Sequence, residues 1–304
     1  MNLLEIGLMA MWAVAAAGLG WYVASVAREV TYVTLADGRR QARSLPLVFK
    51  LLLPFVGNLD RLVSRPMFAR QIALADEMLL SAGFEGVLNG REFVALKILV
   101  PIVLGTFWCV LILILGAVMP DSLVDSGCVP LCFMGVALFY LKPMLWLRKA
   151  LKARHLSIMK ALPFVLDILT LSVEAGMDFI SALQRNCASR KLDPLNEELL
   201  RMTKEIQVGS SRKDALRNMA DRVKQPDLKS VAYALIQADE LGVSIGSILR
   251  IQSEQLRSRR FDRAEKLANE APTKMLGPLM LCIFPAVFII LLGPVLSQAM
   301  DGML

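Results

Sequence analysis

The chain has few of the residues that catalytic and metal sites require. His155 is its only histidine, and none of its five cysteines forms a Cys-x-x-Cys pair. A zinc site needs a fuller set of cysteine and histidine ligands. The Gly-x-x-x-x-Gly-Lys-[Ser/Thr] phosphate loop and the His-Glu-x-x-His metalloprotease motif are both missing. We therefore expect no metal, no cofactor and no catalytic residue, and we predict that the chain is not an enzyme.

Charge is missing from four long stretches of the sequence. These are residues 6–27, 98–120, 126–141 and 275–300. The apolar character of the third stretch continues past Lys142, whose long side chain can reach the membrane interface. A helix needs roughly 20 apolar residues to cross a bilayer core, and the mean hydropathy of +0.54 is typical of a membrane protein. The pattern predicts four transmembrane helices.

Lysine and arginine are unevenly distributed among the segments that connect these stretches. Of the 34 basic residues, nine lie between Arg28 and Arg91 and 23 lie between Arg148 and Lys274. The positive-inside rule places both segments in the cytoplasm, so both termini are expected on the opposite side. The first apolar stretch follows no basic segment and is longer than the apolar core of a signal peptide, which favours a retained membrane helix.

The net charge of +7 does not by itself indicate nucleic-acid binding. Between residues 148 and 274, 23 basic residues are accompanied by 16 acidic ones, as on a mixed solvated surface. The basic run of Arg148, Lys149, Lys152 and Arg154 follows the third apolar stretch. Anionic lipid headgroups are the nearest partner at such a border. We expect contact with the lipid bilayer and none with nucleic acid.

Three glycines recur at a spacing of 33 residues and predict helical hairpin turns. Glycine takes the left-handed conformation just past a helix end, and Asp or Ser then caps the next helix by accepting from its free N–H groups. Each glycine is followed two residues later by such a cap and seven residues later by leucine. The three sets are Gly176, Asp178 and Leu183; Gly209, Ser211 and Leu216; and Gly242, Ser244 and Leu249.

Apolar residues recur at helical spacing in the segments next to these turns. Leu162, Leu166 and Leu169 precede the first glycine on one helix face. Asp193-Pro194 supplies the cap and first-turn proline that start a later helix. We predict an all-α fold, in which a polytopic membrane protein carries a cytoplasmic six-helix antiparallel bundle between its third and fourth spans.

The predicted organisation divides the chain into five parts. They are transmembrane helix 1 (1–27), a cytoplasmic juxtamembrane helical segment (28–92), transmembrane helices 2 and 3 (93–147), the cytoplasmic bundle (148–274), and transmembrane helix 4 with an extracytoplasmic tail (275–304).

The stretch 162–263 resembles the type II secretion system F domain. The matching phrases include Leu171-Ser-Val-Glu-Ala-Gly176, Gly209-Ser-Ser211 and Ala238-Asp-Glu-Leu-Gly242. The last apolar stretch, together with the preceding Lys274, begins Lys274-Met-Leu-Gly-Pro278 and is similar to the ending of the Tad (Flp) pilus platform proteins, TadC more than TadB. The single F domain, and the absence of the Gly-Glu-x-Ser-Gly phrase, argue against the type II secretion protein itself.

This resemblance implies a platform protein of a Tad-type, type IV filament pilus in the bacterial inner membrane. It implies a cytoplasmic secretion or pilus ATPase as a partner, together with a paralogous F-domain platform protein and pilin subunits. The platform would couple ATP hydrolysis to pilin extraction and filament assembly, as a homo- or hetero-oligomer. The alternative is a transporter or permease subunit, which would need ionisable groups inside its spans; only Lys97 and Lys142 are candidates, and both lie near span ends.

Acidic residues lie beside two of the hairpin turns. One hypothesis is that Glu174, Asp239 and Glu240 form an acidic surface that receives the ATPase or a second platform subunit. The alternative is helix-end electrostatics, with Asp178 acting only as an N-cap.

Glycine and proline also interrupt the last apolar stretch. Gly277, Pro278, Pro285 and Pro294 predict kinks in this membrane helix. Small residues of this kind suit close packing on neighbouring or pilin helices, but they are equally typical of ordinary membrane-helix composition.

Overall fold

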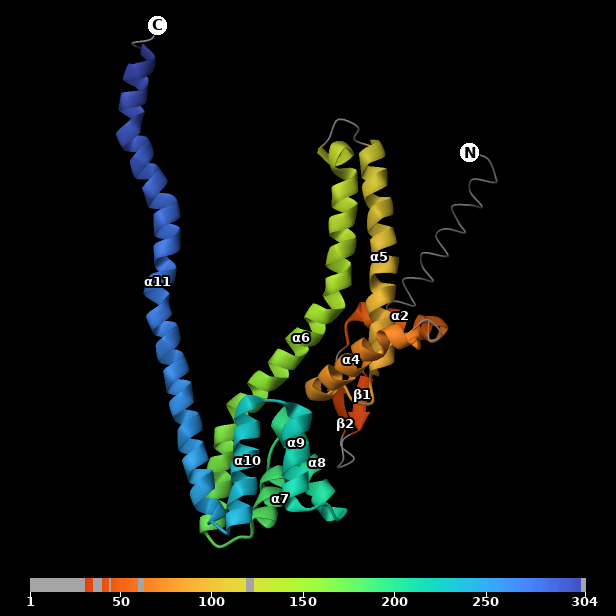
Figure 1. Ribbon diagram of the computed structural model, residues 1–304, viewed down its shortest axis with the longest axis vertical. Coiled ribbons are helices and arrows are strands. Elements are labelled where there is room, and N and C mark those ends of the chain that lie inside the picture. The colour runs from red at the N-terminus through yellow and green to blue at the C-terminus, as the bar shows by residue number, and fades with distance from the viewer. Residues whose placement is uncertain (1–30, 35–39, 44, 60–62, 119–122, 302–304) are drawn as a thin grey trace.

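The computed structural model describes residues 31–34, 40–43, 45–59, 63–118 and 123–301. A compact helical base lies at one end of the molecule, and long helices rise from it (Figure 1). Helices α5 and α6 run side by side, whereas the C-terminal half of α11 extends away from the base by itself. The described chain is helical apart from one short β-hairpin.

Three helices in the described residues are long and apolar enough to cross a membrane. They are α5 (Gly90–Val118), α6 (Leu123–Glu174) and α11 (Ile245–Asp301). These helices contain the second, third and fourth predicted spans. The first predicted span, 6–27, lies outside the described residues, so the count of four stays a prediction.

Helices α5 and α6 pack closely because a glycine lies where a large ring needs room. The indole nitrogen of Trp108 donates to the carbonyl of Leu131 at 3.3 Å. A Cβ atom added to Gly135 would lie 2.2 Å from the indole ring, so only glycine leaves space for it. Trp108 and Phe139 also meet edge to face, with ring centroids 6.4 Å apart. The pair therefore forms a fixed membrane hairpin.

The apolar part of α11 has a different environment. None of the residues in its most hydrophobic stretch is buried against the rest of the described chain. Gly277, Pro278, Pro285 and Pro294 all lie inside α11, and the helix continues through all four positions as one element. The helix is not interrupted at these positions, and the expected kinks stay a prediction. Its surface is free to meet lipid or another protein.

The juxtamembrane segment forms a small body beside the start of α5. In chain order it contains β1 (Thr31–Thr34), β2 (Arg40–Arg43), α2 (Leu47–Val56), the 3-10 turns η1 (Gly57–Leu59) and η2 (Pro66–Phe68), and α4 (Ala69–Ala82). Strands β1 and β2 are antiparallel, with Thr31 opposite Arg43. This hairpin departs from the expected helical segment 28–92. The β-branched and aromatic run of β1 favours a strand, and Asp37-Gly38 is a dipeptide typical of hairpins.

An aromatic cluster holds this body onto the membrane hairpin. The ring of Trp146, from α6, lies 5.0 Å from Phe49 of α2 and 5.1 Å from Phe84, which follows α4. Leu147, the next residue of α6, is fully buried in the same core. Three elements distant in sequence thus share one apolar core, which fixes α4 against the part of α6 that follows its apolar stretch.

The helical bundle has its own core. It contains the C-terminal part of α6, then α7 (Phe179–Ser189), α8 (Pro194–Gln207), α9 (Arg212–Val223), α10 (Pro226–Leu241) and the N-terminal part of α11. The leucines that follow the three glycines, Leu183, Leu216 and Leu249, are all buried in this core. The 33-residue spacing therefore reflects hairpins that each point one leucine into the same interior.

The glycines themselves have the backbone conformation that a turn requires. Gly176, Gly209 and Gly242 have φ angles of +90°, +109° and +68°. The next helices begin at capping side chains in two cases. Asp178 accepts from the N–H of Ile180 at 2.9 Å, and Ser211 accepts from the N–H of Asp214 at 3.0 Å. At the third turn the carbonyl of Ser244 accepts from the N–H of Ile248 at 3.4 Å.

Leu249→Ala tests the role of the recurrent leucines. Leu249 is 0% exposed and Leu241, beside the third turn, is 77% exposed. Deleting the buried side chain should cost about 2–5 kcal/mol of stability, because it leaves a cavity in the bundle core. The matched variant Leu241→Ala should change stability by about 0.5 kcal/mol or less. Thermal unfolding of the detergent-purified chain measures both changes in stability. Equal changes in the two variants would contradict the role of Leu249 in the bundle core.

Candidate functional site

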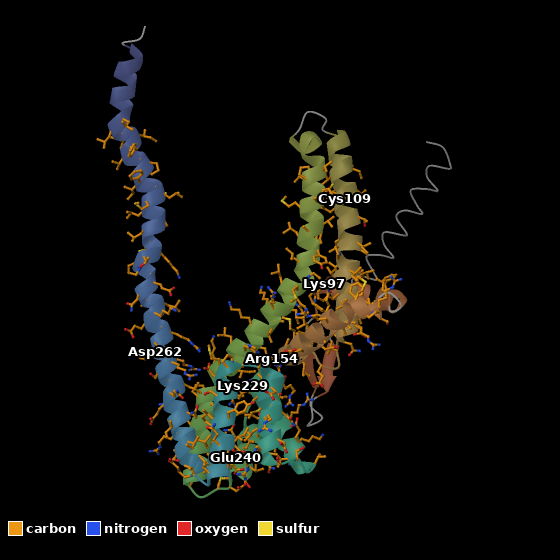
Figure 2. The ribbon with its side chains drawn as sticks, in the orientation of Figure 1. Lys97, Cys109, Arg154, Lys229, Glu240 and Asp262 are labelled. Carbon is orange, nitrogen blue, oxygen red and sulfur yellow. The ribbon has the colours of Figure 1, made fainter. Side chains whose placement is uncertain are left out.

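The three hairpin turns lie at the end of the bundle that is farthest from α5, where Glu240 is labelled (Figure 2). The structure places each of the predicted acidic residues beside a basic side chain. Glu174 pairs with Arg250 of α11 at 2.8 Å, and Glu240 pairs with Lys213 of α9. The first and third turns are therefore tied to neighbouring helices by ion pairs.

Arg212 connects two of the turns at once. One guanidinium nitrogen lies 3.4 Å from Asp239, and another lies 3.6 Å from the capping residue Asp178. The guanidinium also lies over the ring of Phe179, 5.6 Å from its centroid. Arg212 thus brings together Asp178 and Asp239, which are far apart in sequence. Glu174 does not join this group, because it faces Arg250 instead.

These contacts limit the excess of negative charge at the turns. The hydrogen bond from Lys213 holds the pKa of Glu240 below its ordinary value, so this carboxylate is ionised at neutral pH. Its charge is matched by that of Lys213 in the isolated chain. A partner that uses the acidic surface would therefore have to compete with Arg212, Lys213 and Arg250. Apolar side chains are also exposed beside the turns, at Val208 and Leu241.

The third turn also contains the short sequence pattern that surrounds the nucleophilic serine of many hydrolases. Gly242-Val-Ser244-Ile-Gly246 has the Gly-x-Ser-x-Gly spacing. In hydrolases that serine lies between a strand and a helix and is activated by a histidine. Here the motif joins helices α10 and α11, and Nε2 of His155, the only histidine, lies 2.8 Å from the carbonyl of Val223. The motif is a helix turn. Among the described residues, no cluster of acidic, histidine and cysteine side chains could hold a metal ion.

A buried ion network lies at the opposite end of the bundle, where Figure 2 labels Arg154. Arg154 of α6 is 5% exposed and donates to Glu197 and Glu198 of α8, both at 2.8 Å. Arg222 of α9 donates to Glu198 and to Glu205, both at 2.9 Å. The network therefore joins three helices inside the protein.

The position of Arg154 corrects the expectation that it faces lipid headgroups with the rest of its basic run. Leu147, Leu151 and Ile158 lie one or two turns from it on the same face of α6. Because that face of α6 packs against the rest of the protein, the Arg154 side chain lies in the interior. Glu198 lies in the apolar stripe of α8 and Arg222 in that of α9. Charges inside apolar stripes are the sequence signal that could have revealed this network.

The same end of the bundle contacts the juxtamembrane helix α4, and we call this contact the joint. It is formed by Glu77, Ser81, Gly83 and Glu85 on the α4 side and by Arg154, Arg201, Arg222 and Lys224 on the bundle side. Glu85 pairs with Arg201, and Glu77 pairs with Lys224. The hydroxyl of Ser81 donates to the carbonyl of Arg222 at 2.9 Å.

Gly83 gives the joint its closest approach. The residue ends α4 with φ +77°. A Cβ atom there would lie 2.3 Å from a guanidinium nitrogen of Arg154. The end of α4 and the buried network therefore lie in direct contact.

Gly83→Ala tests this contact against Gly86→Ala. Both glycines have left-handed backbone, with φ +77° and +79°, but nothing lies within 4 Å of a Cβ at Gly86. Gly86→Ala should cost only the conformational strain, about 1–2 kcal/mol. Gly83→Ala should cost about 2–4 kcal/mol more, because it displaces a buried guanidinium from its carboxylates. Equal shifts in thermal stability would show that Arg154 can move without cost.

Glu85 gives the joint a dependence on pH. The hydrogen bond from Arg201 lowers the pKa of Glu85 and raises the pKa of Arg201. Because the folded pKa of Glu85 is depressed, its contribution is complete above the ordinary glutamate range, near pH 4.3. It is lost as the pH falls through the lower folded value.

Glu85→Gln should therefore lower stability at pH 7 by about 0.2–1 kcal/mol, the usual range for an exposed ion pair. The difference from the unmodified chain should shrink below about pH 4 and then vanish. Thermal unfolding at a series of pH values measures it. In an Arg201→Gln background the same substitution should have no pH-dependent effect. If Glu85→Gln still changed the pH dependence of stability in the Arg201→Gln background, the effect would belong to another partner of Glu85.

Comparison with known proteins identifies the bundle. Residues 165–293 match the family model described as type II secretion system (T2SS), protein F. No curated protein and no solved structure matches the chain. The matched segment begins inside the bundle part of α6, includes all three hairpin turns, and ends in the apolar part of α11. Domains of this kind occur in inner-membrane platform proteins of secretion and pilus machines.

The apolar helices and this match together indicate an inner-membrane protein. The match extends over residues 165–293, which include most of the bundle and the apolar part of α11, and it supports a relation of this segment to the type II secretion system F family.

Proposed function

We propose that this chain is a platform protein of a Tad-type pilus machine, of the TadC kind. In this proposal a cytoplasmic ATPase acts on the helical bundle, and the resulting movement helps to extract pilins from the membrane into the filament. The F-family match supports the general kind of protein. The resemblance of the last span to Tad proteins supports the specific machine.

The continuity of α11 is the observation that carries this proposal. The helix begins directly after the third hairpin turn and continues to Asp301 without interruption. Its 57 residues correspond to about 85 Å of helix at 1.5 Å per residue. A single continuous helix thus connects the far end of the bundle with the last predicted span. A force applied at the turns has a direct mechanical path to the last span.

Ion pairs fasten the first half of α11 to the bundle. Asp227 of α10 is buried and accepts from Arg259 at 3.1 Å and from Arg263 at 3.3 Å. Arg257 pairs with Asp167 of α6 at 2.5 Å. These contacts keep the cytoplasmic part of α11 aligned with α6 and α10. Movement of the bundle would therefore carry α11 with it rather than bend it at its base.

The unburied apolar half of α11 suits a role in contacting other membrane helices. Gly277 and Pro278 lie near its start, and no atom would lie within 4 Å of a Cβ at Gly277. Small residues allow close approach between membrane helices. In this proposal that half of α11 meets pilin helices or the paralogous platform subunit. The source of energy is an ATPase in trans, because the chain lacks a phosphate loop of its own.

The acidic residues of the third turn are the proposed contact for the ATPase. Reversing both charges, as Asp239→Lys with Glu240→Lys, should abolish filament assembly while leaving the membrane level of the protein unchanged. The same variant should lose the ATPase in a pull-down from detergent-solubilised membranes. Normal assembly in this double variant would contradict the role.

The ion pairs of the turn provide a control that separates binding from folding. Exchanging one pair, as Glu240→Lys with Lys213→Glu, keeps that ion pair with opposite polarity and leaves Arg212 with Asp178 and Asp239. If Glu240 only holds the turn together, this exchanged variant should assemble filaments normally. If Glu240 binds the partner, the exchanged variant should fold normally and still fail to assemble. Recovery of a solute-binding protein instead of an ATPase in the pull-down would favour a transporter.

A further inference from the structure

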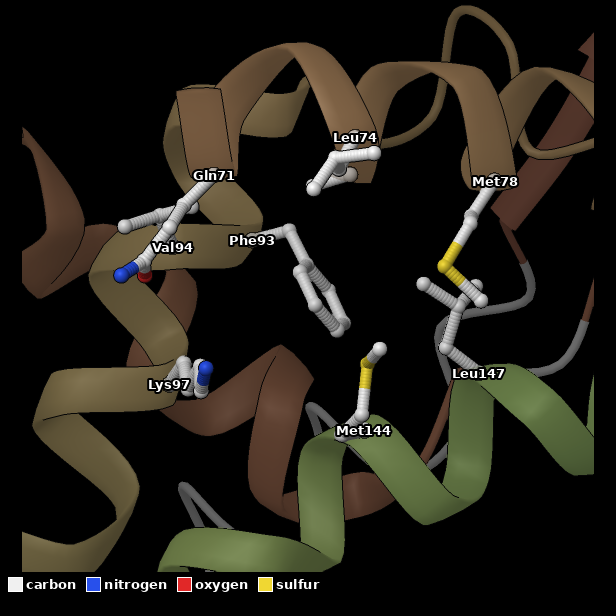
Figure 3. A pocket seen from close by; sticks show the side chains of 9 residues that line it. Gln71, Leu74, Met78, Phe93, Val94, Lys97, Met144 and Leu147 are labelled. Atoms are coloured by element: carbon white, nitrogen blue, oxygen red, sulfur yellow. The ribbon is translucent and has the colours of Figure 1, made fainter. Parts of the chain in front are cut away.

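A small cavity lies where α4 meets the start of α5 and the middle of α6 (Figure 3). Its volume is about 110 Å³. The lining is mostly apolar, with Leu74 and Met78 from α4, Phe93 from α5 and Met144 from α6. Methionine side chains are flexible and adapt to irregular apolar ligands. The cavity is therefore suited to a short length of hydrocarbon rather than to a polar molecule.

One positive charge lies at the edge of this cavity. Lys97 lines it from α5, and its ammonium group lies 5.0 Å from the centroid of the Tyr140 ring. Lys97 forms no ion pair with a carboxylate in the part of the chain that the structure describes. The two nearest acids along the chain are engaged elsewhere: Glu92 accepts from the N–H of Asn89 at 2.9 Å, and Glu85 pairs with Arg201.

The position of Lys97 along α5 places this charge at a membrane border. The uncharged run of α5 begins at the next residue and continues to the end of the helix. On α6, the exposed side chains of Arg148, Lys149 and Lys152 follow the cavity on the cytoplasmic side of the same border. A half-buried cation without a counter-ion, beside an apolar cavity at lipid headgroup depth, is complementary to an anionic amphiphile.

We propose that this cavity binds one anionic phospholipid. The phosphate of the lipid pairs with Lys97, and a segment of one acyl chain enters between Met78, Phe93 and Met144. The bound lipid fills the space between α4, α5 and α6, next to the aromatic core around Trp146. It thereby stabilises the position of α4, which also forms the joint with the bundle.

Native mass spectrometry of the full chain can test this proposal. The chain is reconstituted in phosphatidylcholine nanodiscs with or without phosphatidylglycerol, extracted into detergent at high salt, and analysed for retained lipid. High salt shortens the Debye length to about 3 Å at 1 M and so suppresses attraction to exposed lysines. The unmodified chain should retain phosphatidylglycerol in preference to phosphatidylcholine.

Lys97→Gln should reduce this retention about fivefold or more, as expected for the loss of one cation near a lipid headgroup. Lys142→Gln is the matched control. Lys142 also lies near a span end over an aromatic ring, 5.7 Å from the Phe139 centroid, but it does not line the cavity. Its substitution should leave retention unchanged. Equal loss in the two variants, or no loss in Lys97→Gln, would overturn the proposal.

Two further measurements distinguish the lipid from other occupants. Ala75→Leu places extra volume in the cavity and keeps Lys97, so it should also reduce retention. Undiminished retention in a folded Ala75→Leu chain would show that no acyl chain enters. Phosphatidylglycerol should raise the thermal stability of the chain, whereas inorganic phosphate alone should not. An equal rise with phosphate would overturn the lipid assignment. A photo-reactive residue placed at position 74 should cross-link to lipid. Cross-linking to a protein helix instead would also overturn the lipid assignment.

Discussion

The buried ion network around Arg154 is the constraint on which the arrangement of the molecule depends. Arg154, Glu198 and Arg222 come from three helices and are removed from water together. A buried charge without its partner is strongly destabilising, so α6, α8 and α9 can pack only in a register that brings these groups together. Because α6 is shared by the bundle and the membrane hairpin, the same register orients the bundle relative to α5 and the first half of α6.

The joint extends this constraint to the juxtamembrane body. Gly83 lies against the Arg154 guanidinium, and Glu85 reaches Arg201 on α8. The other end of the bundle is organised differently, because its ion pairs at Arg212 and Lys213 are exposed and individually weak. The structure thus combines a tightly fixed end near the membrane with a more adaptable end at the hairpin turns. This difference agrees with the proposed function, in which the ATPase would bind at the hairpin turns.

Much of the helical framework could be predicted from local sequence. Gly176, Gly209 and Gly242 act within a few residues of themselves, because a left-handed residue ends a helix wherever it occurs. The capping of α7 by Asp178 and the start of α8 at Pro194 are equally local. The hairpin of β1 and β2 differs from the expected helical segment, although the β-branched run of β1 and an Asp37-Gly38 dipeptide are present in the sequence.

The candidate site was predicted less completely than the framework. Glu174, Asp239 and Glu240 were recognised as charges beside turns, but their basic partners come from other helices: Arg250 from α11, and Arg212 and Lys213 from α9. Arg154 was placed at the lipid headgroups because its neighbours in sequence are basic. The packing of α6 against α8 shows that it faces inward, on the same helix face as Leu147 and Ile158.

The sequence by itself determined the apolar helices, the hairpin turns and the leucines that enter the bundle core, because these depend on hydrophobicity and on backbone conformation over short distances. The tertiary structure alone decided which charges meet, where the joint forms, and that a cavity with Lys97 at its edge lies between α4, α5 and α6. Those features depend on side chains that lie tens of residues apart in the chain and become neighbours only when helices pack. Their energies arise from burial and pairing, which no local pattern encodes.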